Sequence, residues 1–370
     1  MGKKDIIFLV TNLDSGGLEN YLLRFVEFSH QNFNNIIIFC KGGRGGVLEE
    51  KYLKISNLSV VKFKVGNGNL MNYFSLFKWL KDYKEYIVCD FTGNFSGPIL
   101  YFAYVIGIKK RIVFYRSSSN RFKENWVKLK INKLFGRLVQ KYATNILANS
   151  NYAFEFFFSN TIIDDRYRVI YNGINIEEFL QCEKFLDLEI KKNATVVGHT
   201  GRYNIAKNHI VMLSVAERII KENNNVYFLF CGKGVPEALN SLVKKKGIEN
   251  NILLFDNRDD ISCVLNSIDI YYFPSITEGQ PNALIEAWIK GKFFVASDIR
   301  PIIDITPLKS QKWLTNCFDE ESQYRLLKEV IDMKSRYCFN EDIARYAKNE
   351  FNAKTRFGEF LDVILTKHNI

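Results

Sequence analysis

The sequence lacks the features that would place it in several large classes of protein. The apolar run nearest its start, Ile6 to Val10, ends at polar Thr11 and is too short for a signal peptide or a membrane span. The seven cysteines are scattered and form no C-x-x-C pair, so we interpret most of them as small buried residues in a reducing compartment. The four histidines show no metal-ligand spacing, and we predict no structural zinc.

Length and composition predict an ordinary globular protein with two cores. A chain of 370 residues exceeds the size at which a single hydrophobic core keeps growing. Hydrophobic residues make up 47% and charged residues 25%, which leaves no case for disorder. We see no repeat of short period and no low-complexity tract.

Positive charge is concentrated in the first half of the chain. The formal net charge is +11. Residues 1–180 hold 25 basic and 15 acidic residues, whereas residues 181–370 hold 26 and 25. Residues 109–141 carry eleven basic residues and one acid, Glu124, with aromatic residues interleaved. This stretch favours an anionic partner, and its three- and four-residue spacing of apolar and basic residues predicts an amphipathic helix.

Short apolar runs alternate with helical patterns along the whole chain. This order is typical of doubly wound α/β domains with buried parallel strands. In the first half we predict strands at Ile6–Val10, Ile36–Cys40, Val60–Phe63, Tyr86–Cys89, Ile112–Tyr115, Ile146–Ala148 and Val169–Tyr171. In the second half we predict strands at Val196–His199, Tyr227–Cys231, Ile252–Phe255, Ile270–Phe273 and Phe293–Ala296.

The pattern restarts after a charged, weakly patterned stretch, which we interpret as a linker. We expect an N-terminal domain over 1–180, a linker over 181–193, a C-terminal domain over 194–342 and a helical segment over 343–370 that packs on either domain. The carboxyl edges of two such sheets bind ligands, so we expect a site in a cleft between them.

A pair of glutamates stands where the second domain should carry its chemistry. After the strand that ends at Phe273, a loop carries Glu278 and a helix begins near Pro281, a residue suited to a helix start. Glu286 lies within this otherwise apolar helix, and an ionised carboxylate there needs a partner. A ribose diol would supply two hydroxyl donors, and a core Arg or Lys is the alternative.

These residues resemble a known family. Glu278 and Glu286, within P-S-x-x-E-G-x-P-N-x-L-I-E-A, are similar to the E-x7-E motif of retaining glycosyltransferases of the two-domain GT-B fold, family 4 in particular. The resemblance implies that Glu286 holds the ribose of a nucleotide-sugar donor and that Glu278 contacts or positions the sugar. It implies donor contacts for Gly279, Pro281, Asn282, Ala283 and Leu284.

Other segments resemble the same family in the same order. Gly201 to Asn208 is similar to G-R-x-x-x-x-K-N, in which Arg202 and Lys207 would hold the donor diphosphate. Two cations would neutralise the charge that grows on the departing diphosphate, so we expect no metal cofactor for that step. Gly232 and Arg258 fall in loops that resemble donor-binding loops, although a G-x-G alone is a weak signal.

The first half carries one further resemblance and one departure. Gly16 and Gly17 begin a G-G-x-E segment that resembles the family's donor loop, with an ordinary strand-to-helix turn as the alternative. Many relatives have a histidine at the end of a first-domain strand, facing the donor sugar. This chain has Arg116, Ser117 and Ser118 there, which we regard as candidates for contact with donor or acceptor. We interpret His199 and His209 as structural.

The sequence thus predicts a cytoplasmic, retaining GT-B glycosyltransferase that uses a nucleotide-sugar, most commonly a UDP-sugar in such relatives. We expect a lipid-linked or polysaccharide acceptor in bacterial surface glycan synthesis, and peripheral docking on an anionic membrane. One alternative is a GT-B relative with other chemistry, a nucleotide-sugar epimerase or a phosphorylase. A basic polyanion-binding protein is a second alternative, although no recognised nucleic-acid module is present.

Overall fold

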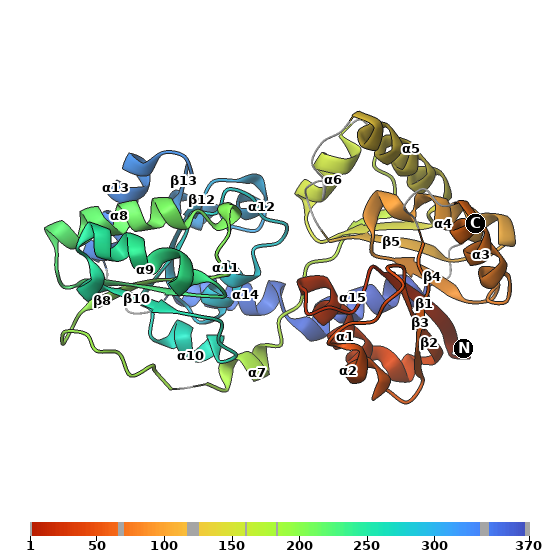
Figure 1. Ribbon diagram of the computed structural model, residues 1–370, viewed down its shortest axis with the longest axis horizontal. Coiled ribbons are helices and arrows are strands. Elements are labelled where there is room, and N and C mark those ends of the chain that lie inside the picture. The colour runs from red at the N-terminus through yellow and green to blue at the C-terminus, as the bar shows by residue number, and fades with distance from the viewer. Residues whose placement is uncertain are drawn as a thin grey trace. The chain divides into compact units, whose positions relative to one another are not determined.

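The computed structural model describes residues 2–65, 70–116, 126–159, 161–182, 184–333 and 340–366. The chain forms two compact units. Unit 1 comprises Met1–Asn172 and Lys354–Ile370, and unit 2 comprises Gly173–Ala353. Each unit alternates strands and helices around one parallel sheet (Figure 1), so the predicted α/β class with two doubly wound domains is confirmed.

Among the described residues, unit 1 holds a seven-stranded parallel sheet in the order β3-β2-β1-β4-β5-β6-β7. Its strands are β1 (Lys4–Val10), β2 (Phe33–Cys40), β3 (Leu58–Lys62), β4 (Ile87–Asp90), β5 (Arg111–Tyr115), β6 (Asn145–Ala148) and β7 (Tyr167–Val169). Its helices are α1 (Gly17–Ser29), α2 (Glu49–Leu53), α3 (Leu70–Lys81), α4 (Gly97–Ile106), α5 (Trp126–Tyr142) and α6 (Asn151–Phe158), with α15 (Ala353–Leu365) from the end of the chain.

Unit 2 holds a parallel sheet in the order β10-β9-β8-β11-β12-β13. Its strands are β8 (Thr195–Thr200), β9 (Val226–Cys231), β10 (Ile252–Phe255), β11 (Ile270–Phe273), β12 (Phe293–Ser297) and β13 (Leu314–Thr315). Its helices are α7 (Ile176–Leu180), α8 (His209–Glu222), α9 (Val235–Lys246), α10 (Ile261–Asn266), α11 (Asn282–Ile289), α12 (Arg300–Ile303), α13 (Glu320–Met333) and α14 (Glu341–Glu350). The short β13 carried no recognisable sequence signal.

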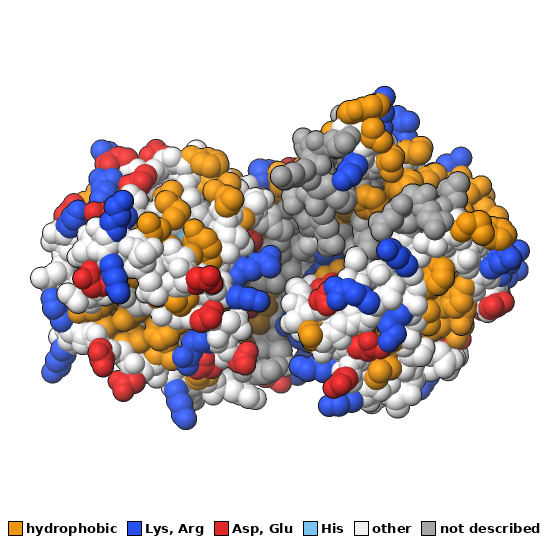
Figure 2. All heavy atoms as spheres, in the orientation of Figure 1, with side chains coloured by type: hydrophobic (Ala, Val, Ile, Leu, Met, Phe, Trp, Pro, Cys, Tyr) orange, Lys and Arg blue, Asp and Glu red, His pale blue; other side chains and the backbone are white. Residues whose placement is uncertain are grey.

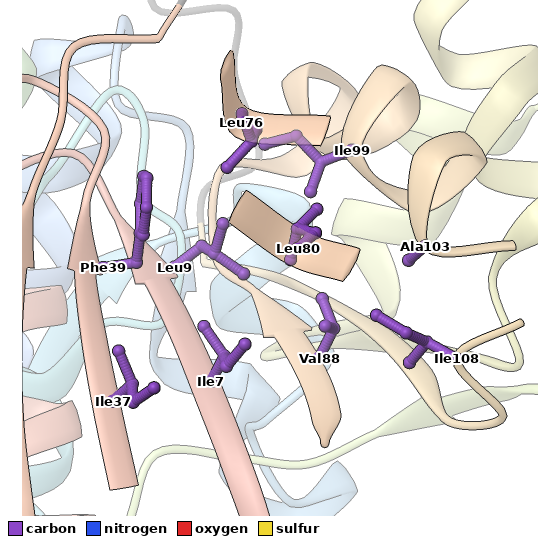
Figure 3. Close-up of a cluster of buried hydrophobic side chains, with 10 residues drawn as sticks. All are labelled: Ile7, Leu9, Ile37, Phe39, Leu76, Leu80, Val88, Ile99, Ala103 and Ile108. Carbon is purple, nitrogen blue, oxygen red and sulfur yellow. The ribbon is translucent and has the colours of Figure 1, made fainter. Parts of the chain in front are cut away.

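Both faces of the first sheet are buried, which explains why its strands are apolar without alternation. Alternate residues of β1 and β2 meet α3 and α4 on one face in a buried cluster (Figure 3). The opposite face carries Phe8, whose ring lies 6.0 Å from that of Phe25 on α1. The first cluster contains Ile7, Leu9, Ile37, Phe39, Leu76, Leu80, Val88, Ile99, Ala103 and Ile108.

The helical end of the chain is split between the units. One helical segment was expected over 343–370, but α14 ends at Glu350 and α15 starts at Ala353. The rings of Trp288 on α11 and Tyr346 on α14 lie 6.5 Å apart. Within unit 1, α15 lies beside α1 (Figure 1), and the rings of Phe25 and Phe360 are 4.4 Å apart. The break coincides with the return of the chain from unit 2 to unit 1.

The segment predicted as a linker, 181–193, belongs to unit 2 by its contacts. A disulfide joins Cys182 to Cys263 of α10, with 5.5 Å between their Cα atoms. Lys290 Nζ and Asn266 Nδ2 both donate to the carbonyl of Cys182, at 3.0 and 2.8 Å. The cysteine interpretation therefore missed one pair, whereas the free thiols are buried as expected. These are Cys40, Cys89, Cys231 and Cys317, and Cys338 lies outside the described residues.

Two helical glycines should respond oppositely to alanine. A Cβ on Gly97 of α4 would lie 2.3 Å from the carbonyl oxygen of Phe135 on α5, so Gly97→Ala forces two helices apart. We expect a loss of about 1–3 kcal/mol in the free energy of unfolding. A Cβ on Gly358 of α15 meets nothing within 4 Å, so Gly358→Ala should stabilise by about 0.5–1 kcal/mol. Urea unfolding of both variants tests this, and equal effects would contradict the described packing of α4 on α5.

Candidate functional site

The predicted donor residues of unit 2 lie at the carboxyl ends of four strands. Arg202 follows β8, Gly232 follows β9, Arg258 follows β10 and Glu278 follows β11. Because the strands are parallel and β10, β9, β8 and β11 are successive neighbours, these loops meet at one edge of the sheet. Such an edge is where doubly wound sheets bind ligands.

The turns after β8 and β9 touch backbone to backbone. Gly201 N donates to the carbonyl of Cys231 at 2.8 Å, and Tyr203 N donates to that of Lys233 at 2.9 Å. A Cβ on Gly232 would lie 2.1 Å from the carbonyl oxygen of Gly201. Glycine is therefore required at position 232 by the fold itself, and its predicted contact with a donor stays a prediction.

An ion pair joins the loops after β8 and β11. Lys207 Nζ lies 2.6 Å from Glu278 Oε1, and the two side chains are 17% and 11% exposed. The loops are held in place by the backbone, because Ile276 N donates to the carbonyl of Ala206 at 2.8 Å. The side chain of Asn204 accepts a hydrogen bond from Lys207 N at 3.0 Å. Two predicted catalytic residues, 71 positions apart, are thus brought together.

Arg202 lies exposed at the same turn as Lys207. Among the described residues, no carboxylate forms an ion pair with Arg202. The turn thus presents one cation that is already neutralised by Glu278 and a second that is exposed to solvent. An incoming diphosphate would meet positive charge held by rigid backbone, at little cost in reorganisation.

The two glutamates of the motif both affect the pKa of one buried hydroxyl, that of Tyr271. Tyr271 on β11 hydrogen-bonds through its hydroxyl to Thr200 Oγ1, at 2.8 Å. Burial raises the pKa of Tyr271, and the carboxylates of Glu286 and Glu278 raise it further. Both carboxylates therefore lie within electrostatic range of one point, beneath the turn that carries Arg202.

Helix α11 begins after Pro281, as the sequence predicted, and Gly291 takes a positive φ of 64° just after its end. Most of the helix is buried, whereas Glu286 is half-buried. The predicted donor contacts Gly279, Asn282 and Ala283 are also half-buried, and Leu284 is fully buried. Glu286 therefore occupies the partly accessible face of α11.

Arg258 is held by its own loop. Its Nε and Nη2 each lie 2.7 Å from an oxygen of Asp260. This bidentate pair raises the pKa of Arg258 and lowers that of Asp260, mainly through the hydrogen bonds. Contact of Arg258 with a nucleotide base stays a prediction, and any such contact would start from a guanidinium already paired.

In unit 1, the glycine turn is closed by the helix that follows it. A Cβ on Gly16 would lie 2.3 Å from Glu19 Oε2, so the carboxylate folds back over the start of α1. A Cβ on Gly17 would meet nothing within 4 Å, so Gly17 is open to a neighbouring group. Arg116 follows β5 and stacks on Tyr21, with 3.5 Å from its Cζ to the ring centroid. Ser117 and Ser118 lie outside the described residues.

Sequence reasoning missed a buried ion pair at the carboxyl edge of the first sheet. Lys41, after β2, places Nζ 2.8 Å from Oδ2 of Asp90, the last residue of β4. Asp90 Oδ1 accepts from Thr92 N at 2.8 Å, and the side chain of Asp90 is fully buried. The available signal was a charged residue directly at the end of each of two apolar strands.

The two buried histidines lie beneath the turn that carries Lys207. His199 Nδ1 lies 3.0 Å from the carbonyl oxygen of Tyr272, and its ring centroid is 5.1 Å from that of His209. Burial lowers the pKa of His199 well below its usual value and that of His209 to about 4. The positive charge of Lys207 contributes to the lowering of both pKa values, so the pair is neutral at pH 7 and packs as part of the scaffold.

Comparisons with known proteins agree with this architecture. Residues 15–178 match the family described as Glycosyltransferase Family 4, and residues 194–330 match Glycosyl transferases group 1. The chain is 23% identical to the capsular polysaccharide biosynthesis glycosyltransferase CapH of Staphylococcus aureus, over 98% of this chain and 99% of that one. It is 26% identical to a UDP-Gal:alpha-D-GlcNAc-diphosphoundecaprenol alpha-1,3-galactosyltransferase of Escherichia coli, over 53% of each chain.

Solved structures share the fold over nearly the whole chain. HepE of Anabaena in complex with UDP superposes with a TM-score of 0.78 at 16% identity, covering 97% of this chain and 98% of that one. A glycosyltransferase of Rickettsia africae superposes with a TM-score of 0.81 at 18% identity, covering 98% of both chains. Among the residues described here, no cluster of His, Cys, Asp or Glu has the grouping of a metal site.

The buried histidines predict a dependence of stability on pH. As pH falls below about 6.5, His209 takes up a proton in the unfolded chain but stays neutral in the folded protein until about pH 4. The free energy of unfolding therefore decreases across this window. At pH 5, His209 alone should cost about 2 kcal/mol relative to pH 7.5. Urea unfolding at both pH values should show a smaller difference for His209→Gln than for wild type. His30→Gln, in a partly exposed 3₁₀ turn, is the control, and the same pH difference in His209→Gln as in wild type contradicts the prediction.

Proposed function

This chain belongs to the family 4, group 1 glycosyltransferases, and we propose that it transfers a sugar from a UDP-sugar to a lipid-linked or saccharide acceptor with retention of configuration. The relative CapH is described as a glycosyltransferase of capsular polysaccharide biosynthesis. The observation that carries the proposal is the Lys207–Glu278 ion pair, joined at one sheet edge by exposed Arg202 and half-buried Glu286. UDP is favoured because HepE is described in complex with it.

In this proposal Lys207 and Arg202 receive the diphosphate of the donor. The bond from the anomeric carbon to the diphosphate oxygen breaks, and a bond from that carbon to an acceptor hydroxyl oxygen forms. Negative charge grows on the diphosphate in the transition state because the electron pair of the breaking bond stays on its oxygen. The proton of the acceptor hydroxyl then passes to the departing diphosphate. Two preplaced cations stabilise that charge, and Glu278 limits the repulsion between them before donor binds.

The two glutamates have separate roles in the proposal. Glu286, on the partly accessible face of α11, accepts hydrogen bonds from the ribose hydroxyls, which a carboxylate does more strongly than a neutral group. Glu278 positions the sugar while remaining paired with Lys207. Support for a lipid diphosphate acceptor comes from the Escherichia coli relative, whose described acceptor is a diphosphoundecaprenol-linked sugar.

Removing either cation should slow the reaction far more than it disturbs the fold. Arg202→Ala or Lys207→Ala is expected to cost about 2.7–4 kcal/mol of transition-state stabilisation, a loss of roughly 10²–10³ in kcat. The measurement is UDP release from a panel of UDP-sugars, with and without membrane extract. Lys246→Ala is the matched control. Lys246 is the last residue of α9, at the end of the helix away from the Gly232 turn, and it pairs with Glu217 of α8. Wild-type turnover in both site variants would contradict the proposed role of Arg202 and Lys207 in stabilising the diphosphate.

We further propose that unit 1 docks on an anionic membrane through α3, α4 and α5. On α5 the side chain of Trp126 is 68% exposed and that of Leu134 is 53% exposed, while Gly136 and Val139 are buried against the unit. On α4, Tyr104 is 54% exposed. Figure 2 shows hydrophobic and basic side chains side by side over this part of unit 1. Other exposed apolar residues of these helices are Met71, Phe74, Tyr101, Val105, Val127, Leu129 and Ile131.

Exposed lysines flank this apolar surface. Lys128, Lys130 and Lys133 are exposed on α5, and Lys130 Nζ lies 4.9 Å from the ring centroid of Trp126. Apolar side chains that enter the headgroup region, together with cations worth roughly 1 kcal/mol each at an anionic surface, hold a protein on a membrane without a span. Among the described residues, no helix is long and apolar enough to cross a bilayer.

Co-sedimentation with vesicles tests the docking surface. Wild-type protein should bind vesicles rich in phosphatidylglycerol, release with salt, and bind neutral vesicles weakly. Reversing Lys128, Lys130 and Lys133 to Glu should weaken binding by at least tenfold, because six units of charge change at the surface. The matched control reverses Lys244, Lys245 and Lys246 on α9 of unit 2. Equal loss from both triple variants, or equal binding to neutral vesicles, rules out docking through α5.

A further inference from the structure

A partly buried cation at the carboxyl edge of the first sheet has no carboxylate as counter-charge among the described residues. Arg116 follows β5, and its Nη1 is sealed from solvent without a hydrogen-bond partner. Burial, with a smaller contribution from the nearby cation Arg24, lowers the pKa of Arg116 to about 10. The guanidinium remains charged at neutral pH, so the fold holds a partly desolvated positive charge at a place where ligands bind in such sheets.

The guanidinium is fixed by aromatic rings. Its Cζ lies 3.5 Å from the ring centroid of Tyr21 on α1 and 4.9 Å from that of Phe114 on β5. The Tyr21 hydroxyl is also buried, and no hydrogen bond of ordinary geometry reaches it. Burial raises the pKa of Tyr21 to about 12, an effect that the neighbouring Arg116 partly offsets. Stacking stabilises a cation but leaves its in-plane N–H donors unused. Arg116 Nη1 and the Tyr21 hydroxyl, on neighbouring side chains, can therefore each donate to a further acceptor.

A second arginine of β5, Arg111, differs from Arg116 in having hydrogen-bond acceptors for its guanidinium. Arg111, at the other end of β5, donates from Nε to the carbonyl of Tyr142 at 2.7 Å and from Nη1 to that of Ile108. Arg111 is thus satisfied by backbone carbonyls, as a structural arginine is expected to be. Within the part of the chain that the structure describes, Arg116 Nη1 has no such acceptor, which a structural role alone does not explain.

We propose that Arg116 receives an oxyanion of a substrate of this enzyme, with Tyr21 as the second donor. The inference rests on the proposed glycosyl transfer and adds a selectivity to it, because one substrate must carry a carboxylate or phosphate that reaches unit 1. A planar guanidinium suits either anion. Such an oxyanion has two sources: the carboxylate of a uronic-acid sugar on the donor, and the diphosphate of a lipid-linked acceptor.

Binding measurements with matched ligand pairs separate these sources. Calorimetry compares UDP-glucuronic acid with UDP-glucose, and farnesyl-diphospho-GlcNAc with the farnesyl glycoside of GlcNAc. For one pair, Arg116→Gln should weaken the anionic member about ten- to a hundredfold, the scale of a charge-assisted hydrogen bond, and leave the neutral member within about twofold. Arg116→Lys, which keeps the charge without the fork, should fall between.

Arg111→Gln is the control, since it removes a partly buried guanidinium from the same strand away from the proposed subsite. Thermal unfolding of each variant checks that unit 1 is folded. Binding of UDP by the wild-type protein tests the proposed function separately, because the proposed diphosphate site lies in unit 2. If Arg116→Gln changes both members of each pair equally, or if wild type binds neither anionic ligand more tightly than Arg116→Gln does, the oxyanion subsite is wrong.

Discussion

Burial of the parallel sheets on both faces is the constraint from which the rest of the molecule follows. Apolar runs such as Ile6–Val10 of β1 and the whole of β9 leave no place for charged side chains along their length. Polar and charged groups therefore emerge where the strands end. The loops after β8 and β11 carry Lys207 and Glu278 at such an edge, and Lys41 and Asp90 mark the corresponding edge of the first sheet. Charged side chains that can bind or react with a ligand therefore lie at the carboxyl edges of the sheets, because the apolar interior does not accommodate them.

The strand pattern was readable because a doubly buried strand is a continuous apolar run. The ranges Ile252–Phe255 and Ile270–Phe273 were predicted with the bounds that the structure has. The short β13 and the break between α14 and α15 could not be read in this way. A two-residue strand leaves almost no pattern, and the break is set by the point where the chain returns to unit 1, which is a long-range event.

The site was predictable where residue identity fixes chemistry, and less so where it depends on partners. The spacing of Glu278 and Glu286 suggested a common site, and both carboxylates raise the pKa of Tyr271. The sequence did not reveal that Arg258 is held by Asp260, that Cys182 pairs with Cys263, or that Arg116 Nη1 has no acceptor among the residues described. Each depends on which atoms the fold brings within a few ångströms, and local sequence does not encode that distance.

The position of α15 also bears on how the protein is made. Unit 2 is one continuous stretch, Gly173–Ala353, whereas unit 1 recruits its last helix after unit 2 has been completed along the chain. Until then Phe25 and Phe114 lack the ring of Phe360 that packs on both. During translation the N-terminal half therefore emerges from the ribosome with an exposed apolar face. That face is closed only when synthesis reaches α15, so the unit translated first completes its core last.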